Sequence, residues 1–130
     1  MKRKMILFLP IVLLLFGCPN DDMPIEEETL ENVTYEVLFW EFTPDTGHET
    51  VRLRYKIEFY NPNNVAINGF YKITQDADGL VSTLLSTNLS PCYQIEANSS
   101  CTFSFDEEDS FDIAMINSID FVSAEYNFED

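Results

Sequence analysis

Basic residues, glycine and histidine are scarce in this sequence, and each shortage narrows the classes of protein it can belong to. Seven Lys and Arg stand against 23 Asp and Glu, a formal net charge of −16 at pH 7. Such a surface repels phosphate backbones, so we expect no nucleic-acid binding. Four glycines and one histidine form no phosphate-cradling loop, nucleophile elbow or histidine-rich metal set. We therefore expect no enzyme and no cofactor.

The N-terminal segment has the three-part layout of an export signal. A basic start at 2–4 precedes an apolar run at 5–16, which is shorter than the roughly 20 residues that a membrane-spanning helix needs. The sequence LFGC at 15–18 resembles the lipobox of bacterial lipoproteins. The resemblance implies cleavage after Gly17 and lipidation of Cys18. The alternative is a secretory signal followed by an incidental cysteine.

Lipidation of Cys18 would hold the chain on a membrane, because each buried methylene contributes about 0.8 kcal/mol. Cleavage removes three of the seven basic residues and leaves 4 against 23 acids, a net charge of −19. Asp21 and Asp22 are similar to acidic export signals of certain Gram-negative lineages, although a generic solvated linker explains them equally well. We expect a protein of the bacterial cell envelope, lipid-anchored at the outer membrane and displayed on the cell surface.

Three regions follow from this interpretation: a signal peptide at 1–17, lipidated Cys18 with a disordered acidic linker at 18–31, and a folded domain at 32–130. The linker sequence, PNDDMPIEEETLE, has too little apolar surface to fold alone. No second apolar run follows Cys18, so the membrane contact is expected at the N-terminal lipid only.

Apolar and polar residues alternate through most of the folded domain, which predicts half-buried strands. The clearest strand covers 51–59, and others are expected at 33–41, 65–75, 80–86, 94–95, 100–105 and 119–128. The segment 106–117 is ambiguous between a helical turn capped by Asp109 and a loop. These elements predict an all-β fold, a small immunoglobulin-like antiparallel β-sandwich of about seven strands. Residues expected to share a core face within their strands are Val33, Tyr35, Val37 and Phe39, and Val122, Ala124, Tyr126 and Phe128.

One stretch resembles a known family of immunoglobulin-like domains. The sequence VRLRYKIEFYNPNNVAINGFYKI at 51–73, with YQIEANSSCTFSF at 93–105, is similar to the late-embryogenesis-abundant type 2 pattern. In that pattern an alternating strand runs into Asn-Pro-Asn, which is Asn61-Pro62-Asn63 here. The resemblance implies the fold and transfers no catalytic site.

Cys92 and Cys101 are the cysteines that remain after lipidation. An exported compartment is oxidising, so we expect a disulfide between them. Two free thiols are the alternative.

Acidic residues offer two candidate calcium sites. Asp76 and Asp78 lie in an Asp-x-Asp-Gly turn, and the run Asp106–Asp109 is followed by Asp112. Neither completes an EF-hand loop, so a plain β-turn and a solvated helix start are the competing interpretations.

Four aromatic residues fall on the phase opposite the core residues of their strands. They are candidate contacts for a sugar ring or a protein partner, unless a bulge returns them to the core: Trp40, Phe42, Tyr60 and Phe70. Three cations, Arg52, Arg54 and Lys56, project from one strand face. They form a small anion site or, as we favour, face acids such as Glu36 across strands.

These observations favour a non-enzymatic, membrane-anchored lipoprotein that acts as a surface-displayed binding or accessory module of an envelope complex. The alternative is a stand-alone domain that binds a glycan or calcium, and a minimal hydrolase is a third hypothesis. The envelope partner is a protein or a glycan, and the oligomeric state stays open.

Overall fold

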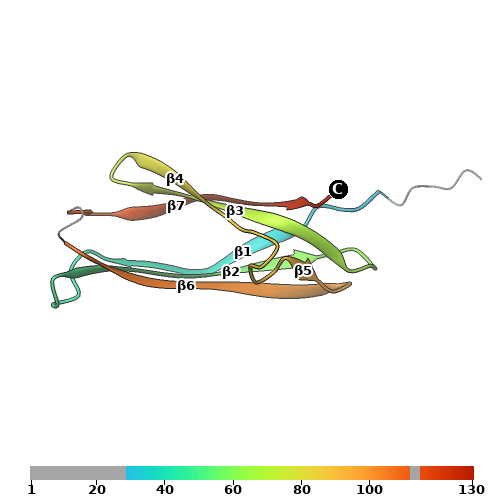
Figure 1. Ribbon diagram of the computed structural model, residues 1–130, viewed down its shortest axis with the longest axis horizontal. Coiled ribbons are helices and arrows are strands. Elements are labelled where there is room, and N and C mark those ends of the chain that lie inside the picture. Colours follow the sequence, from blue (N-terminus) through green and yellow to red (C-terminus); the bar gives the residue numbers. More distant parts are fainter. Residues whose placement is uncertain (1–28, 112–114) are drawn as a thin grey trace, which may run out of the picture.

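Residues 29–111 and 115–130 are described by a computed structural model, and they fold into two antiparallel β-sheets packed face to face (Figure 1). The strands are β1 (Thr34–Thr43), β2 (Thr50–Asn61), β3 (Ile67–Ala77), β4 (Leu80–Leu85), β5 (Gln94–Ile95), β6 (Ser99–Ser110) and β7 (Ile119–Phe128). The prediction of a small all-β sandwich is confirmed. No helix in the two described ranges is long and apolar enough to cross a membrane.

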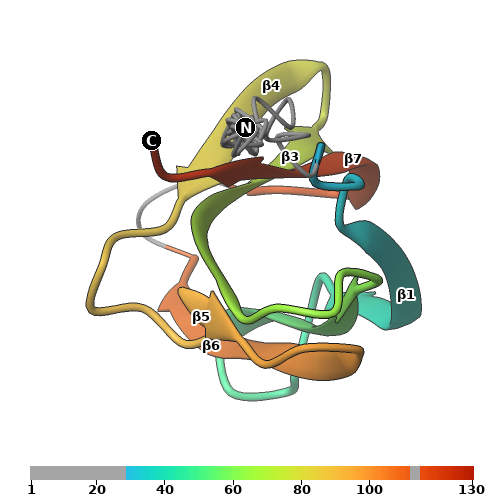
Figure 2. The same cartoon turned by 90° about the vertical axis from the view of Figure 1, so that its right-hand side faces the viewer.

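Each sheet is organised around one central strand. In the first sheet β2 pairs with β1 on one side and with β6 on the other. In the second, β3 pairs with β7 on one side, and with β4 and β5 at the two ends of its other side. The end-on view in Figure 2 shows β1 closing the gap between the sheets on the β7 side. On the opposite side of the sandwich, the second sheet ends at β4 and the first sheet ends at β6.

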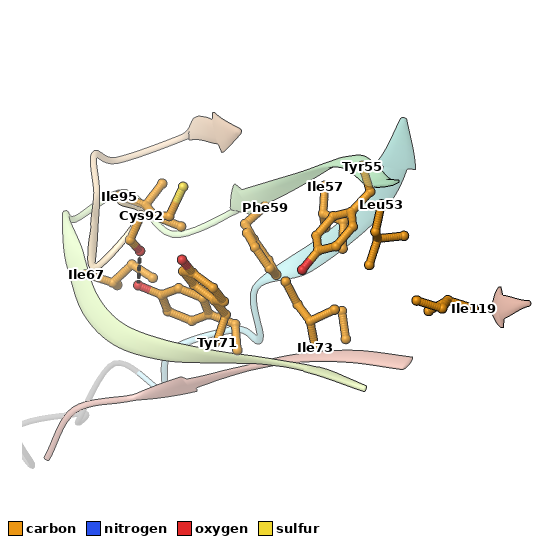
Figure 3. Close-up of a cluster of buried hydrophobic side chains, with 12 residues drawn as sticks. Leu53, Tyr55, Ile57, Phe59, Ile67, Tyr71, Ile73, Cys92, Ile95 and Ile119 are labelled. Carbon is orange, nitrogen blue, oxygen red and sulfur yellow. Dashed lines mark hydrogen bonds between the residues drawn. The ribbon is translucent and has the colours of Figure 1, made fainter. Parts of the chain in front are cut away.

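Strand β2 contributes the largest part of the core, and its apolar and polar residues alternate without interruption. Every second residue from Val51 to Phe59 is buried, as the sequence predicts. The rings of Phe59 and Tyr71 stack across the sandwich at 5.3 Å between centroids (Figure 3). Ile73, Ile95 and further residues of the second sheet complete the same cluster.

A β-bulge in β1 changes the predicted faces of that strand. The pairing with β2 shifts between Val37 and Phe39, so that Phe39 lies beside Lys56 instead of on the core face. After the bulge the inward and outward positions of β1 are exchanged, so Trp40 and Phe42 pack against the core. The prediction that Phe39 shares the face of Val37 is therefore wrong, because one extra residue inverts the alternation.

A second bulge has the same effect in β7. Thr74 pairs with Ser123 but Gln75 pairs with Phe121, which leaves Val122 as the extra residue. Its side chain is 52% exposed, whereas Phe121 packs against the core. The prediction that Val122 is in step with Ala124 and the core residues after it is wrong for this reason.

The segment after Phe105 is also different from the expectation. Strand β6 continues through Asp106–Ser110, so neither a helical turn nor a loop begins at Asp106. The reason is β2, whose first residues from Thr50 onward pair with this acidic stretch along its full length.

Candidate functional site

The two cysteines of the folded domain form the expected disulfide. The sulfur atoms of Cys92 and Cys101 are bonded, with 5.5 Å between the Cα atoms. The bond fastens the segment before β5 to the start of β6. The hydroxyl of Tyr126 lies 2.9 Å from the carbonyl oxygen of Cys92 and 2.8 Å from that of Tyr93, and donates to this pair of acceptors. Burial raises the pKa of Tyr126 to about 12. Cys18, the predicted lipidation site, lies outside the described residues.

The four candidate aromatic contacts do not share one surface. Trp40 stacks on Tyr55 at 4.3 Å between centroids, and its indole N–H donates to the carbonyl of Ile119 at 2.8 Å. Phe42 packs beside the same core. The structure therefore places both of these rings between the sheets.

The other two aromatic residues lie on outer faces of different sheets. Tyr60 follows buried Phe59 on β2 and is 39% exposed. Phe70 precedes buried Tyr71 on β3 and contacts Tyr93, with 5.6 Å between ring centroids. These two residues cannot contact one small ligand together.

Asp78 forms hydrogen bonds with the segment that precedes β7. Its carboxylate accepts hydrogen bonds from the backbone N–H of Asn117 at 2.8 Å and of Ser118 at 3.0 Å. These hydrogen bonds lower the pKa of Asp78, and the bond from Asn117 has the largest effect. Asp76 accepts a separate bond from the N–H of Gly79 at 2.7 Å and closes the β3–β4 turn.

The acidic run in β6 is divided by the strand's alternation. Asp106 and Glu108 lie on the outer face, whereas Glu107 and Asp109 pair with Leu53 and Val51 and share their inward phase. The four carboxylates therefore do not converge on one ion, and Asp112 lies outside the described residues. Across 29–111 and 115–130 no group of three or more His, Cys, Asp or Glu is arranged to hold a metal.

The outward-facing acids of β6 form ion pairs with Arg52 of β2. Arg52 donates from Nε and Nη2 to the two carboxylate oxygens of Asp106, at 2.8 and 2.7 Å, and its Nε lies 3.8 Å from Glu108. The bidentate contact lowers the pKa of Asp106 and raises that of Arg52. Cross-strand ion pairing is thus present, and the partners of Arg52 are on β6.

The named partner, Glu36, was wrong in register. Glu36 lies opposite Glu58, two residues along β2 from Lys56, so none of the three cations is its direct cross-strand partner. Arg54 instead has Glu41 at 4.0 Å.

A cleft of about 340 Å³, which the sequence patterns do not predict, lies at the end of the sandwich. Its lining is partly apolar and partly polar. The apolar part includes Phe42, Val51, Leu53, Phe105, Ile116 and Ile119, and the polar part includes Gln75, Ser82, Glu107 and Asp109. The signal was in the sequence, because Phe103, Phe105, Glu107 and Asp109 follow one period of two. A strand that continues past Phe105 places both acids on the inward face.

Strand β4 presents a second unusual surface. All six of its residues are exposed, although four of them are Leu or Val: Leu80, Val81, Leu84 and Leu85. The following loop adds Leu89, which is 91% exposed. The alternation of the strand divides the four: Leu80 and Leu84 share the inward phase of Ala77 and Ile73, and Val81 and Leu85 face the other way. Apolar exposure on an edge strand is typical of interaction surfaces.

No family model, curated protein or solved structure matches this chain. Fold and surface together define it as a small disulfide-linked β-sandwich with an acidic, partly apolar cleft.

Proposed function

We propose that the chain is a non-enzymatic lipoprotein, anchored to the bacterial envelope through Cys18, whose β-sandwich is a surface-displayed binding or accessory module. The observation that carries the proposal is the N-terminal arrangement of a basic start, a short apolar run and LFGC ending at Cys18. A permanently anchored domain meets its partners at one membrane surface, which suits a component of an envelope complex.

The described surface supports a binding role. Exposed Leu and Val side chains gather on β4, and an apolar cleft with carboxylates opens beside β6. A single exposed leucine is ordinary on a protein surface, but Leu80 and Leu84, exposed on the face of β4 that is turned toward the cleft, are typical of a site that another molecule covers.

The anchor is tested by metabolic labelling with an alkyne-tagged palmitate in a lipoprotein-processing bacterium. We expect the full chain to be labelled and Cys18→Ser to lose the label completely. Cys101→Ser is the matched control, because it removes a cysteine of the folded domain and should keep the label. Persistent labelling of Cys18→Ser would refute the lipid anchor.

Surface display and partners are tested on intact cells. A protease that cannot cross the outer membrane should degrade the full chain, and cross-linking in the native envelope should join it reproducibly to one protein. Protection from protease would contradict surface display. Recovery of polysaccharide alone would favour a glycan-binding domain, for which the outward Phe70–Tyr93 pair is the first ring surface to mutate.

A further inference from the structure

Between β4 and the second half of β6 the two sheets are separated by an open groove. The cleft at the end of the sandwich and a neighbouring hollow lined by Leu84, Leu85 and Phe103 share two residues, Phe105 and Glu107. Figure 1 shows β4 rising away from β6 at this place. We call this continuous surface the β4–β6 groove.

The groove has apolar side chains on both of its walls, which belong to the two sheets. On β4, Leu84 pairs with Ile73 and Leu80 with Ala77, so both leucines lie on the inward face of their sheet. On β6, Phe105 pairs with buried Tyr55 and is also inward. Leu80 is nevertheless 73% exposed and Leu84 38% exposed, because no described strand lies between β4 and β6.

The groove also carries negative charge that the folded chain does not neutralise. Glu107 and Asp109 share the inward phase of Phe105 and have no ion pair within 29–111 and 115–130, whereas Asp106 and Glu108 contact Arg52 on the other face. With a net charge of −16 in the full sequence, a second copy of this chain would bring repulsion to this place. A cationic occupant would bring attraction.

The backbone of β6 is available to such an occupant. Within the described residues β6 pairs with β2 alone, so it is an edge strand of its sheet. Alternate residues of an antiparallel edge present N–H and C=O groups outward, ready for another strand. The stretch 104–109 is long enough for a partner strand of about 20 Å.

We propose that the β4–β6 groove binds an extended, cationic segment of a partner polypeptide, which adds to the edge of β6 as a further strand. Alternate side chains of the segment enter the groove. Apolar ones pack between Phe105 and Leu84, and basic ones lie beside Glu107 and Asp109. This mode combines main-chain hydrogen bonds with side-chain selection. The inference rests on the proposed binding function and names the chemistry of its partner.

The test uses the full chain and a defined probe, a capped peptide of about eight residues in which valine and lysine alternate. We expect saturable binding and slowed hydrogen exchange of β6 backbone amides within 104–109. A peptide with N-methyl groups on alternate amides should lose this protection, because it lacks the donors that a strand requires. A valine–glutamate peptide should not bind.

The deciding variant is Glu107→Gln with Asp109→Asn, which keeps shape and removes both inward charges. We expect it to weaken binding about tenfold or more. The matched control is Asp120→Asn with Glu125→Gln, which removes the same charge from exposed positions on β7, and it should change binding less than about twofold. Far-ultraviolet circular dichroism of each variant verifies the fold.

Equal weakening by both double variants would show general charge attraction and overturn the groove. Absence of binding, or protection located away from β6, would overturn it as well. The proposed lipoprotein function is judged separately: cross-linking to an envelope protein that survives Glu107→Gln with Asp109→Asn would leave that function standing while the groove inference fails.

Discussion

The side-chain oxygen of Asn61 accepts two hydrogen bonds from Asn63, one from its backbone N–H and one from its Nδ2, each at 2.9 Å. Asn61 is fully buried, and its own Nδ2 lies 2.9 Å from the carbonyl oxygen of Val65, 3.2 Å from that of Ile95 and 3.1 Å from that of Glu96. The Asn-Pro-Asn sequence is thus a buried hub that fastens the end of β2 to the strand segments around it.

Asn63 extends the hub to the start of the domain. Its side chain accepts a hydrogen bond from the N–H of Glu31 at 2.7 Å and donates to the Glu31 carbonyl at 2.9 Å. These two hydrogen bonds fix the position of Glu31 beside the β2–β3 turn.

We predict that Asn61→Leu lowers the free energy of unfolding by about 2–3 kcal/mol, because buried carbonyls and the Asn63 amide lose their partner. Urea denaturation measures the loss. The exposed neighbour Asn64, changed to Ala, should alter stability by less than about 0.5 kcal/mol. An Asn61→Leu protein as stable as the wild type would refute the hub's role.

Gly69 of β3 lies against β7 with no room for a Cβ atom. A Cβ atom there would lie 2.4 Å from the backbone oxygen of Asn127 and 2.5 Å from Cε1 of Tyr126. We predict that Gly69→Ala costs about 1–3 kcal/mol, since backbone must move to relieve the contact. Asn68→Ala, at an exposed position one residue earlier, is the control in the same thermal melts. A Gly69→Ala variant with unchanged Tm would contradict the packing described for this strand pair.

The disulfide closes a loop whose cysteines are 9 positions apart in the sequence. We predict that the Cys92→Ser, Cys101→Ser double variant is less stable by about 2–4 kcal/mol. Addition of a reductant should bring the wild type to the stability of this variant and leave the variant unchanged. If the reductant destabilised both proteins equally, the effect would not come from this bond.

Tyr126 makes the domain sensitive to alkali. Burial raises its pKa from 10.0 in the unfolded chain to about 12 in the folded protein. A raised pKa of this kind means that stability is fully present below pH 10 and falls as pH rises toward 12, because the unfolded state releases the proton first. Tyr55 and Tyr71 have pKa values raised by burial and add to the same fall.

Tyr126→Phe isolates this contribution. At neutral pH the variant should lose about 1 kcal/mol, the hydrogen bond to the carbonyls of Cys92 and Tyr93. Above pH 10 its stability should decline less steeply than that of the wild type. Parallel declines in denaturation curves taken across pH 9–12 would show that the hydroxyl does not titrate as described.

The sequence predicts most strands because alternation is a local property. Strand β2 is the clearest example, since a uniform period of two needs no knowledge of its neighbours. The bulges at Val37/Phe39 and at Val122 are not local, because an extra residue is defined only against the partner strand. This is why Trp40 and Phe42 were assigned to the outer phase.

The extension of β6 was missed for a different reason. Its Asp and Glu residues have low strand propensity, and pairing with β2 overrides that preference. The inward acids Glu107 and Asp109 were missed with it. The groove they line needs both sheets in place, so local sequence patterns alone do not reveal it.

The position of Trp40 gives the protein a built-in optical reporter. It is the one tryptophan of the chain, stacked on Tyr55 of the first sheet and hydrogen-bonded to Ile119 of the second. Its emission therefore measures the seam between the sheets. Molecules that bind the outer faces should leave the Trp40 fluorescence unchanged. Separation of the two sheets, or binding in the cleft beside Phe42 and Ile119, should change its emission wavelength and intensity.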